Sequence, residues 1–370
     1  MTRVALVHDW LDRPMGGGER VLMELAGMFP EAPVYTLLFD PSRFEGGIDP
    51  RRVRTSWLQR LPRAVRTRPR SLLPLIPTAV EALDLSGYDL VISSSVAFVK
   101  NVLTPPGTLH ISYCHSPMRF AWDYWPRYLD DMGAGPLRRL AVSALVSRIR
   151  LWDLAGAARV DRWITNSRTS AARLRKYYRV TEVEVIHPPV DVAGLSRLAA
   201  ATRGDHFVTL STLTPYKRID LAVRAFSAAG RRLVVVGDGP DRPRLERLAG
   251  PSVGFAGHVS DAERARLLST ARALVFPGEE DFGIAGVEAL ACGTPVVAYA
   301  RGGLTEIVTP DRGGVLFDEQ TVPALNRAVE RLLDLDLARG RLVEEAGRFA
   351  APRFRSEIRR VVEAAGAIPP

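Results

Sequence analysis

Short apolar runs alternate with helix-like segments along nearly the whole chain, and this alternation constrains the fold more than any other feature. The runs with the apolar character of buried strands occupy residues 4–8, 34–39, 90–95 and 163–167 in the first half and 206–212, 233–236 and 273–276 in the second half. Strands that alternate with helices favour parallel sheets with helices on both faces. The sequence therefore predicts an α/β fold with two doubly wound parallel sheets that face a cleft.

The length of the chain favours two domains. Its 370 residues exceed one ordinary core, because domains typically contain about 100–200 residues. Two prolines at 188 and 189 and the small-residue run 199–204 mark the expected link between them. We therefore expect a first domain over residues 1–195 and a second domain over residues 205–348.

Charge and cysteine content narrow the class of protein. The chain carries 50 Lys+Arg against 41 Asp+Glu, and a basic surface attracts anionic partners. No signature of a nucleic-acid-binding module is present, so we expect no nucleic-acid partner. Cys114 and Cys292 match no metal spacing and favour a reducing compartment. Because a signal-peptide pattern and an apolar run of about 20 residues are both missing, we expect a cytoplasmic protein, at most peripheral on the inner face of the cell membrane.

Eight arginines between residues 51 and 70 form the densest basic stretch of the chain. Apolar residues such as Trp57, Leu58 and Leu61 lie among them. Basic residues beside apolar ones are typical of a patch that meets anionic lipid headgroups. The same pattern also fits a solvated basic face over a loop-rich subdomain, and both interpretations remain open.

The segment 276–290 is the clearest candidate for a functional site. The apolar run that ends at Phe276 leads into a short loop with Glu279, Glu280 and Asp281, and a helix-like pattern begins at Ile284. The N-terminus of such a helix attracts an anion through its unpaired N–H groups. The acids either complement the helix dipole or accept hydrogen bonds from hydroxyls that flank a phosphate, as in a sugar nucleotide.

Seven residues separate Glu280 from Glu288, and this E-x7-E pattern, with Phe-Gly-Ile after the first acid, resembles the family 4 retaining glycosyltransferases of the GT-B fold. Segments 292–298 and 301–308 continue the resemblance. Segments 8–10, 85–95 and 114–123 are similar to a narrower subgroup, the WbaZ-like mannosyltransferases of surface-polysaccharide assembly. The resemblance covers nearly the whole chain and implies two Rossmann-like domains, with a C-terminal helix over 349–370 that packs back on the first domain.

The resemblance also implies roles for individual residues. Glu280 would bind hexose hydroxyls and Glu288 the nucleotide ribose, whereas Lys217 would neutralise the diphosphate. Thr212 stands where the family usually has an arginine, and Arg218 is expected to compensate. His115 would contact the transferred sugar from the first domain, so His115, Lys217 and Glu280 are the expected catalytic residues. The remaining expected donor-binding positions are Gly17, Gly18, Gly237, Gly239, Val259, Phe282, Gly283 and Ile284.

Simpler interpretations of the same residues remain open. The glycines at 16–18 follow a strand and precede a helix expected over 21–29, where they either approach a phosphate or only form a tight turn. Lys217 is either a diphosphate ligand or an exposed lysine at a helix start. His8, His110 and His258 are expected to be structural.

The expected function is that of a retaining hexosyltransferase. It would move mannose from GDP-mannose to a glycan or lipid-linked glycan acceptor in surface polysaccharide synthesis. No metal is required, since no Asp-x-Asp motif follows a strand. The leaving phosphate oxygen would assist the acceptor, because no carboxylate is placed as a nucleophile.

Two other functions compete with this one. A non-catalytic scaffold subunit that binds a nucleotide sugar is favoured only by Thr212. A GT-B sugar-nucleotide 2-epimerase would need no acceptor, but it would lack the combination of Lys217 with the E-x7-E pattern. A dinucleotide-dependent dehydrogenase is disfavoured by the missing G-x-G-x-x-G motif.

Overall fold

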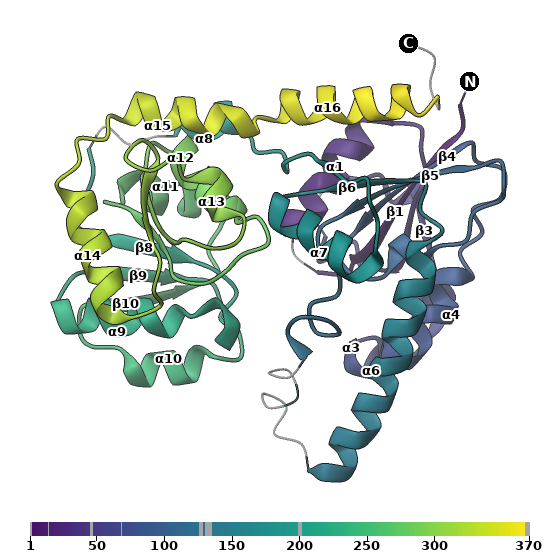
Figure 1. Cartoon of the computed structure of the whole chain (residues 1–370), viewed down its shortest axis with the longest axis horizontal. Helices are drawn as coiled ribbons and strands as arrows, with labels where there is room; N and C mark the ends of the chain where they lie inside the picture. The colour runs from purple at the N-terminus through teal and green to yellow at the C-terminus, as the bar shows by residue number, and fades with distance from the viewer. Residues whose placement is uncertain are drawn as a thin grey trace. The chain divides into compact units, whose positions relative to one another are not determined.

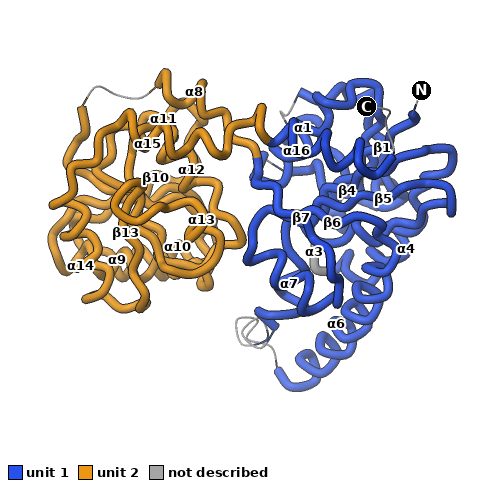
Figure 2. The backbone as a smooth tube through the Cα atoms, turned by 45° about the horizontal axis from the view of Figure 1, so that its top comes forward, with its two compact units in different colours: residues 1–188, 354–370 blue, residues 189–353 orange. Residues whose placement is uncertain are grey.

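The computed structural model describes residues 2–13, 15–44, 47–67, 69–125, 129, 135–198 and 202–366 (Figure 1). The chain forms two compact units (Figure 2). Unit 1 comprises Met1–Pro188 with Phe354–Pro370, and unit 2 comprises Pro189–Arg353. Residues 199–201 of the expected interdomain link lie outside the described residues.

Unit 1 is built on a seven-stranded parallel sheet in the order β3-β2-β1-β4-β5-β6-β7. The strands are β1 (Val4–Leu11), β2 (Val34–Phe39), β3 (Val53–Thr55), β4 (Leu90–Ser95), β5 (Leu109–Cys114), β6 (Arg162–Thr165) and β7 (Glu184–Val185). Every residue of β4 is buried, because helices and loops cover both faces of a parallel sheet. The strand order reverses between β1 and β4, and ligands of such sheets bind at the carboxyl ends of the strands near this point.

The longer helices of unit 1 lie on both sides of its sheet. They are α1 (Gly17–Met28), α6 (Pro136–Ala157), α7 (Arg168–Tyr178) and α16 (Ala351–Ala364), with the short α2 (Arg63–Arg66), α3 (Pro69–Leu72) and α4 (Ile76–Glu81) and the 3-10 turns η1 (Pro50–Arg52), η2 (Trp57–Arg60), η3 (Leu73–Leu75) and η4 (Val99–Asn101). Helix α16 contributes Phe354, Ile358 and Val361 to the same apolar core as Leu22 and Leu25 of α1. The last helix of the chain is therefore part of the N-terminal unit.

The start of α1 differs from the sequence-based expectation. The helix begins at Gly17 and not at residue 21, because the Glu19 carboxylate accepts a hydrogen bond of 2.9 Å from the N–H of Gly16 and caps the first turn. Gly17 and Gly18 are therefore the first helical residues and do not belong to a loop.

Unit 2 is built on a six-stranded parallel sheet in the order β10-β9-β8-β11-β12-β13. Its strands are β8 (Phe207–Leu210), β9 (Leu233–Val236), β10 (Val253–Gly257), β11 (Leu274–Phe276), β12 (Val296–Tyr299) and β13 (Gly314–Phe317). Its helices are α8 (Val192–Arg197), α9 (Ile219–Ala229), α10 (Arg242–Leu248), α11 (Asp261–Thr270), α12 (Ile284–Ala291), α13 (Leu304–Ile307), α14 (Val322–Leu333) and α15 (Arg339–Ala346), with the 3-10 turns η5 (Pro215–Lys217) and η6 (Gly347–Phe349). Two doubly wound parallel sheets confirm the predicted fold class.

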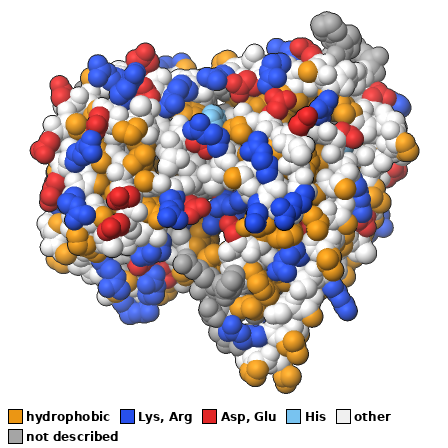
Figure 3. Space-filling model, in the orientation of Figure 1, with side chains coloured by type: hydrophobic (Ala, Val, Ile, Leu, Met, Phe, Trp, Pro, Cys, Tyr) orange, Lys and Arg blue, Asp and Glu red, His pale blue; other side chains and the backbone are white. Residues whose placement is uncertain are grey.

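No helix in the described ranges combines the length and the apolar character that a bilayer span requires. On the face drawn in Figure 3, basic side chains are interspersed with acidic ones, and hydrophobic side chains gather at the lower tip where α6 begins. Leu137 and Leu140 in the first turns of α6 are 83% and 69% exposed. Contact with an anionic membrane stays a prediction.

Candidate active site

In unit 1, the predicted site residue His115 meets two other polar residues, His8 and Ser94, where the strand order reverses. His115 follows β5, His8 lies in β1, and Ser94 lies in β4 between them. The Ser94 hydroxyl is 3.1 Å from Nε2 of His115 and 3.2 Å from Nδ1 of His8. His8 and Ser94 are paired in the strand register, so the sheet itself brings them together. A buried serine thus links two imidazole rings.

Glu19 extends this cluster toward helix α1. One of its oxygens lies 3.8 Å from Nε2 of His8, while the other accepts the N–H of Gly16. Burial raises the pKa of Glu19, but the interactions with His8 and with backbone N–H groups outweigh it, so the net pKa is below the ordinary value. Glu19 therefore supplies a negative charge behind His8, and the groups run in the order Glu19, His8, Ser94, His115.

Gly18 brings the N-terminus of α1 close to His115. A Cβ atom added at Gly18 would lie 2.7 Å from a methyl carbon of Val96 and 3.7 Å from Nε2 of His115. Only a residue without a side chain fits at this close approach. The predicted positions Gly17, Gly18 and His115 are therefore gathered at one place in unit 1.

Asp9 holds the loop that follows β4. Its buried carboxylate accepts the backbone N–H groups of four consecutive residues, at 2.6, 3.0, 2.6 and 3.2 Å; they are Val96, Ala97, Phe98 and Val99. A carboxylate that accepts several N–H groups fixes a loop strongly. Asp9 therefore keeps Val96 against Gly18, although it contacts no predicted site residue itself.

In unit 2, Lys217 and Glu280, which the resemblance predicts to be catalytic, form an ion pair. Lys217 ends η5, and Glu280 lies in the loop between β11 and α12. The Lys217 ammonium donates a hydrogen bond to Oε1 of Glu280, and the two side chains are 12% and 15% exposed. Burial lowers the pKa of Lys217, but attraction to Glu280 and other acidic groups outweighs it and leaves the pKa above its usual value. A fixed positive charge therefore sits beside the loop.

The loop from β11 to α12 depends on two glycines. Gly278 packs directly against the backbone carbonyl of Lys217, where a Cβ atom has no room. Gly283 has a φ of +94° and caps α12, a conformation that favours glycine. Phe282 buries its ring in the core, 5.7 Å between ring centroids from Phe349, and Ile284 begins the helix. The loop thus offers backbone groups at the N-terminus of α12.

Arg218, which is expected to compensate for Thr212, contacts neighbouring polar side chains of unit 2. Thr212 is exposed. The Arg218 guanidinium lies 3.4 Å from Asp220 and donates to Gln320 at 3.1 Å. Gln320 in turn donates to the carbonyl of Pro277 at 2.8 Å. Arg218 is therefore directed to Gln320, a residue that the sequence did not single out, and through it to the start of the site loop.

Glu288 is buried within α12 and is only 2% exposed. Nη2 of Arg264, in α11, lies 3.3 Å from its Oε1. Arg264 was also not expected from the sequence. Its guanidinium places an opposite charge beside the buried carboxylate.

The remaining donor-binding candidates lie at the same carboxyl edge of the unit 2 sheet. Gly237 follows β9 and donates its N–H to Gly257 at 2.8 Å, and Gly239 donates to Asp238 at 2.7 Å. Both glycines pack so closely on residues 211–213 that a side chain has no room. Val259 follows β10 and packs on the core. These three residues thus pack against nearby residues of unit 2, next to the edge of the sheet where Lys217 and Glu280 meet.

Two family models match consecutive parts of this chain. The model of glycosyltransferase family 4 matches residues 15–193, and the model of glycosyl transferases group 1 matches residues 197–349. The chain belongs to glycosyltransferase family 4. The two matches together cover most of unit 1 and unit 2, and they confirm the resemblance on which the site assignments depend.

Curated relatives of this family 4 chain act on different acceptors. It is 35% identical over 158 residues to the GDP-mannose-dependent alpha-(1-6)-phosphatidylinositol dimannoside mannosyltransferase of Mycobacterium tuberculosis, covering 42% of this chain and 37% of that protein. It is 33% identical over 230 residues to the D-inositol 3-phosphate glycosyltransferase of Salinispora arenicola, covering 52% and 51%. The chain thus spans about half or less of these relatives.

Solved structures share the fold over the whole family 4 chain. The sucrose-phosphate synthase of Thermosynechococcus elongatus aligns with a TM-score of 0.73 at 20% identity, covering 99% of this chain and 100% of that one. HepE of Anabaena, solved in complex with UDP-glucose, aligns with a TM-score of 0.64 at 18% identity, covering 97% and 99%. At these identities the likeness supports the GT-B fold alone.

Proposed function

We propose that this family 4 chain is a retaining hexosyltransferase that moves mannose from GDP-mannose to a glycan or lipid-linked glycan acceptor. The observation that carries the proposal is the ion pair of Lys217 and Glu280 beside the N-terminus of α12. The Lys217 ammonium, which can bind a diphosphate, is in direct contact with the Glu280 carboxylate, which can bind sugar hydroxyls. The similarity to the GDP-mannose-dependent mannosyltransferase of Mycobacterium tuberculosis supports GDP-mannose as the donor.

The proposed reaction breaks the bond between C1 of the mannose and the diphosphate oxygen. The electron pair leaves with the diphosphate, and positive charge develops on the sugar ring. Lys217 and the N-terminal N–H groups of α12 stabilise the departing oxygen, since pre-oriented donors are most effective where charge develops. An ammonium group has three N–H donors, so Lys217 can contact the diphosphate without releasing Glu280.

The acceptor hydroxyl attacks C1 from the face that the diphosphate leaves, so the anomeric configuration is retained. Its proton passes to the leaving phosphate oxygen, which is the base closest to it in this geometry. Glu280 positions the hexose through its hydroxyls, and Glu288 with Arg264 holds the ribose. His115, oriented by Ser94, contacts the sugar. No metal ion takes part in the proposed reaction, since Lys217 and the helix terminus supply the positive charge.

The decisive test combines nucleotide-sugar binding with turnover. A ligand that binds only the folded state raises the melting temperature, by an amount equivalent to about 2.7 kcal/mol at 100 times its Kd. GDP-mannose, UDP-glucose, UDP-GlcNAc, ADP-glucose and dTDP-sugars should be compared, and GDP-mannose should give the largest shift. Lys217→Ala should reduce this shift, whereas Arg247→Ala, which removes an exposed charge of α10, should not.

Glu280→Gln separates catalysis from binding. It should keep most of the shift with GDP-mannose and lose hydrolysis and transfer, while Glu319→Gln at an exposed position keeps both. A shift with another donor would replace mannose in the proposal, and a covalent mannosyl adduct on Glu280 would overturn the direct transfer to the acceptor. A shift without hydrolysis or transfer in the wild type would favour a scaffold subunit over an enzyme, and no shift with any donor would contradict both functions.

A further inference from the structure

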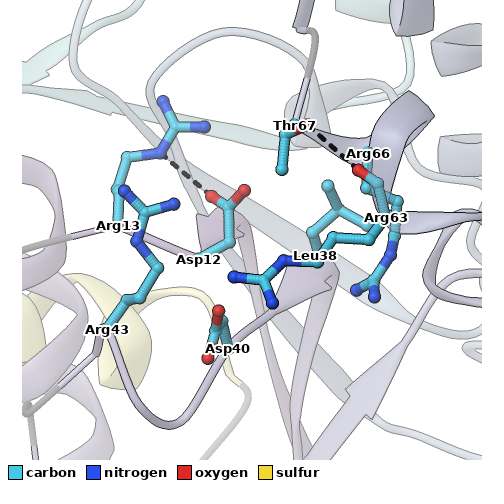
Figure 4. A pocket seen from close by; sticks show the side chains of 8 residues that line it. All are labelled: Asp12, Arg13, Leu38, Asp40, Arg43, Arg63, Arg66 and Thr67. Carbon is cyan, nitrogen blue, oxygen red and sulfur yellow. Dashed lines mark hydrogen bonds and ion pairs between the residues drawn. The ribbon is translucent and has the colours of Figure 1, made fainter.

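Unit 1 contains a pocket of about 300 Å³ at the carboxyl ends of β1 and β2. We call it the arginine pocket, and its lining residues are Asp12, Arg13, Leu38, Asp40, Arg43, Arg63, Arg66 and Thr67 (Figure 4). The volume corresponds to about ten water molecules at ~30 Å³ each. All lining residues belong to unit 1, so the pocket is complete within this unit.

The two aspartates of the arginine pocket already have partners. Oδ1 of Asp12 accepts a hydrogen bond of 3.1 Å from Nε of Arg13. Oδ1 of Asp40 accepts the backbone N–H and the hydroxyl of Ser42, at 3.1 and 2.6 Å. Hydrogen bonds from Ser42 and attraction to Arg43 and Arg63 lower the pKa of Asp40, against the smaller effect of burial. Both carboxylates are therefore already engaged by hydrogen bonds.

The other three arginines lack such partners. Within the described part of the chain, the guanidinium groups of Arg43, Arg63 and Arg66 form no ion pair and donate no hydrogen bond to another residue. Nε of Arg66 is buried and is among the polar side-chain atoms without a partner in the described ranges. A buried donor without an acceptor is costly. The pocket thus has one buried donor without a partner, Nε of Arg66, two exposed arginines, Arg43 and Arg63, and a net excess of two positive charges.

This charge matches a phosphate monoester. A phosphate ester carries a charge between about −1.5 and −2 near neutral pH and presents three acceptor oxygens. Guanidinium groups bind such oxygens in a planar, bidentate geometry. A carboxylate would neutralise only one of the two excess charges and offers two oxygens, so it fits the arginine pocket less well.

The position of the pocket relates it to the candidate site in unit 1. The sheet order β2-β1-β4-β5 puts the end of β2 three strands from the end of β5, where His115 lies. Adjacent strands are about 4.8 Å apart, so the two places are roughly 14 Å apart along one edge of the sheet. One elongated molecule can therefore occupy both.

We infer that the arginine pocket binds a phosphate group carried by the acceptor and holds the acceptor's sugar end toward His115. This inference rests on the proposed function, since it assigns the substrate class that reaches the unit 1 site. The phosphate belongs either to a soluble phosphorylated sugar or to a lipid headgroup, because the arginines contact the phosphate alone.

Tryptophan fluorescence can test the inference in the full-length chain. All six tryptophans lie in unit 1, and the Arg13 guanidinium is 5.3 Å from the ring centroid of Trp10. Titration with inorganic phosphate should give a saturable change in the wild type. In the Arg63→Gln/Arg66→Gln double variant, the Kd for phosphate should rise at least about tenfold for each arginine that is removed. The reason is the loss of charge-assisted hydrogen bonds.

Matched variants make the result specific. Arg359→Gln removes the same charge from an exposed position of α16 in unit 1 and should respond as the wild type does. Lys217→Ala, which alters unit 2, should also keep the response. An equal phosphate response in the double variant and the wild type, or no response in the wild type, would overturn the inference.

Vesicles distinguish the two sources of phosphate. If wild type binds phosphatidylcholine vesicles only when they contain phosphatidic acid, and the double variant does not, the source is a lipid headgroup. Phosphate binding without vesicle binding supports a soluble phosphorylated acceptor. The double variant should show the same rise in melting temperature with nucleotide sugars as the wild type. If the wild type itself shows no such rise, the proposed function is wrong, and the arginine pocket is an anion site unrelated to it.

Discussion

The hydroxyl of Ser94 lies 3.1 Å from Nε2 of His115, and the contact joins two strands that are adjacent in the sheet but separated in sequence. The hydroxyl also lies 3.2 Å from Nδ1 of His8. A hydrogen bond to one ring nitrogen selects the tautomer and the orientation of the imidazole. In the proposed reaction Ser94 is therefore a positioning residue, which orients the His115 ring.

Ser94→Ala should reduce donor turnover by about tenfold and leave the Kd of the donor nearly unchanged, since about 1.4 kcal/mol of orientation is lost. Ser112→Ala is the control: its hydroxyl is buried in β5 without a hydrogen-bond partner in the described ranges. Equal kinetics for the two variants would contradict the role of Ser94.

Lys100→Met should destabilise unit 1 by about 3–5 kcal/mol, the usual cost of removing one partner of a buried ion pair. Nζ of Lys100 lies 2.5 Å from Oδ1 of Asp153, and neither side chain is exposed. Asp153 would remain buried with hydrogen bonds from Asn101, Trp122 and Tyr178 but without the charge of Lys100. Urea unfolding, monitored by tryptophan fluorescence, measures the loss. The control Lys176→Met, at an exposed position of α7, should change the free energy of unfolding little.

His110 should make unit 1 less stable in mild acid. Burial lowers the pKa of His110 to about 4, whereas an unfolded histidine titrates near ~6.5. Below that pH the unfolded chain binds a proton that the folded chain does not, so the free energy of unfolding falls by about 2 kcal/mol between roughly pH 7 and pH 5.

Denaturant unfolding across this pH range tests the His110 prediction. His110→Gln should be less stable at neutral pH, because the bond to Ser93 is altered, but its stability should depend less on pH. His258→Gln, at an exposed histidine, should keep the wild-type slope. A wild-type slope in His110→Gln would assign the acid sensitivity to other groups.

Phe354→Ala should cost about 3–5 kcal/mol, as removal of a buried phenyl ring usually does. Phe354 is 2% exposed, and its ring centroid lies 5.9 Å from that of Tyr113 in β5. The loss should appear in tryptophan fluorescence, which reports on unit 1. Arg359→Ala on the same helix should be nearly neutral, and a similar loss there would indicate a general effect on α16.

Much of the fold was predictable, because the apolar runs of a parallel sheet are buried on both faces and stand out in the sequence. The run 90–95 coincides with β4 (Leu90–Ser95), and 233–236 coincides with β9. The start of α1 was missed, since glycine is a poor helix former and the cap depends on the fold of Glu19 back to Gly16.

The candidate site was predictable only in part. Lys217 and Glu280 carry motifs that can be recognised along the chain, and they do meet. Ser94 could not be chosen among three consecutive serines, because its partner depends on the register of β4 with β1 and β5. Gln320 and Arg264 join the site through contacts between distant segments. The arginine pocket likewise gathers residues from β2, from the segments that follow β1 and β2, and from α2 and its end, which no local pattern connects.

The place of α16 in the core of unit 1 has a consequence for synthesis. The N-terminal unit lacks Phe354, Ile358, Val361 and Val362 until the end of the chain has been made. At about 5–20 residues per second, the ribosome needs on the order of ten seconds or more to translate the intervening unit. During that time the nascent unit 1 exposes an unfilled groove, whereas unit 2 can complete its core from a continuous stretch. The unit that is translated first is therefore the last to complete its core.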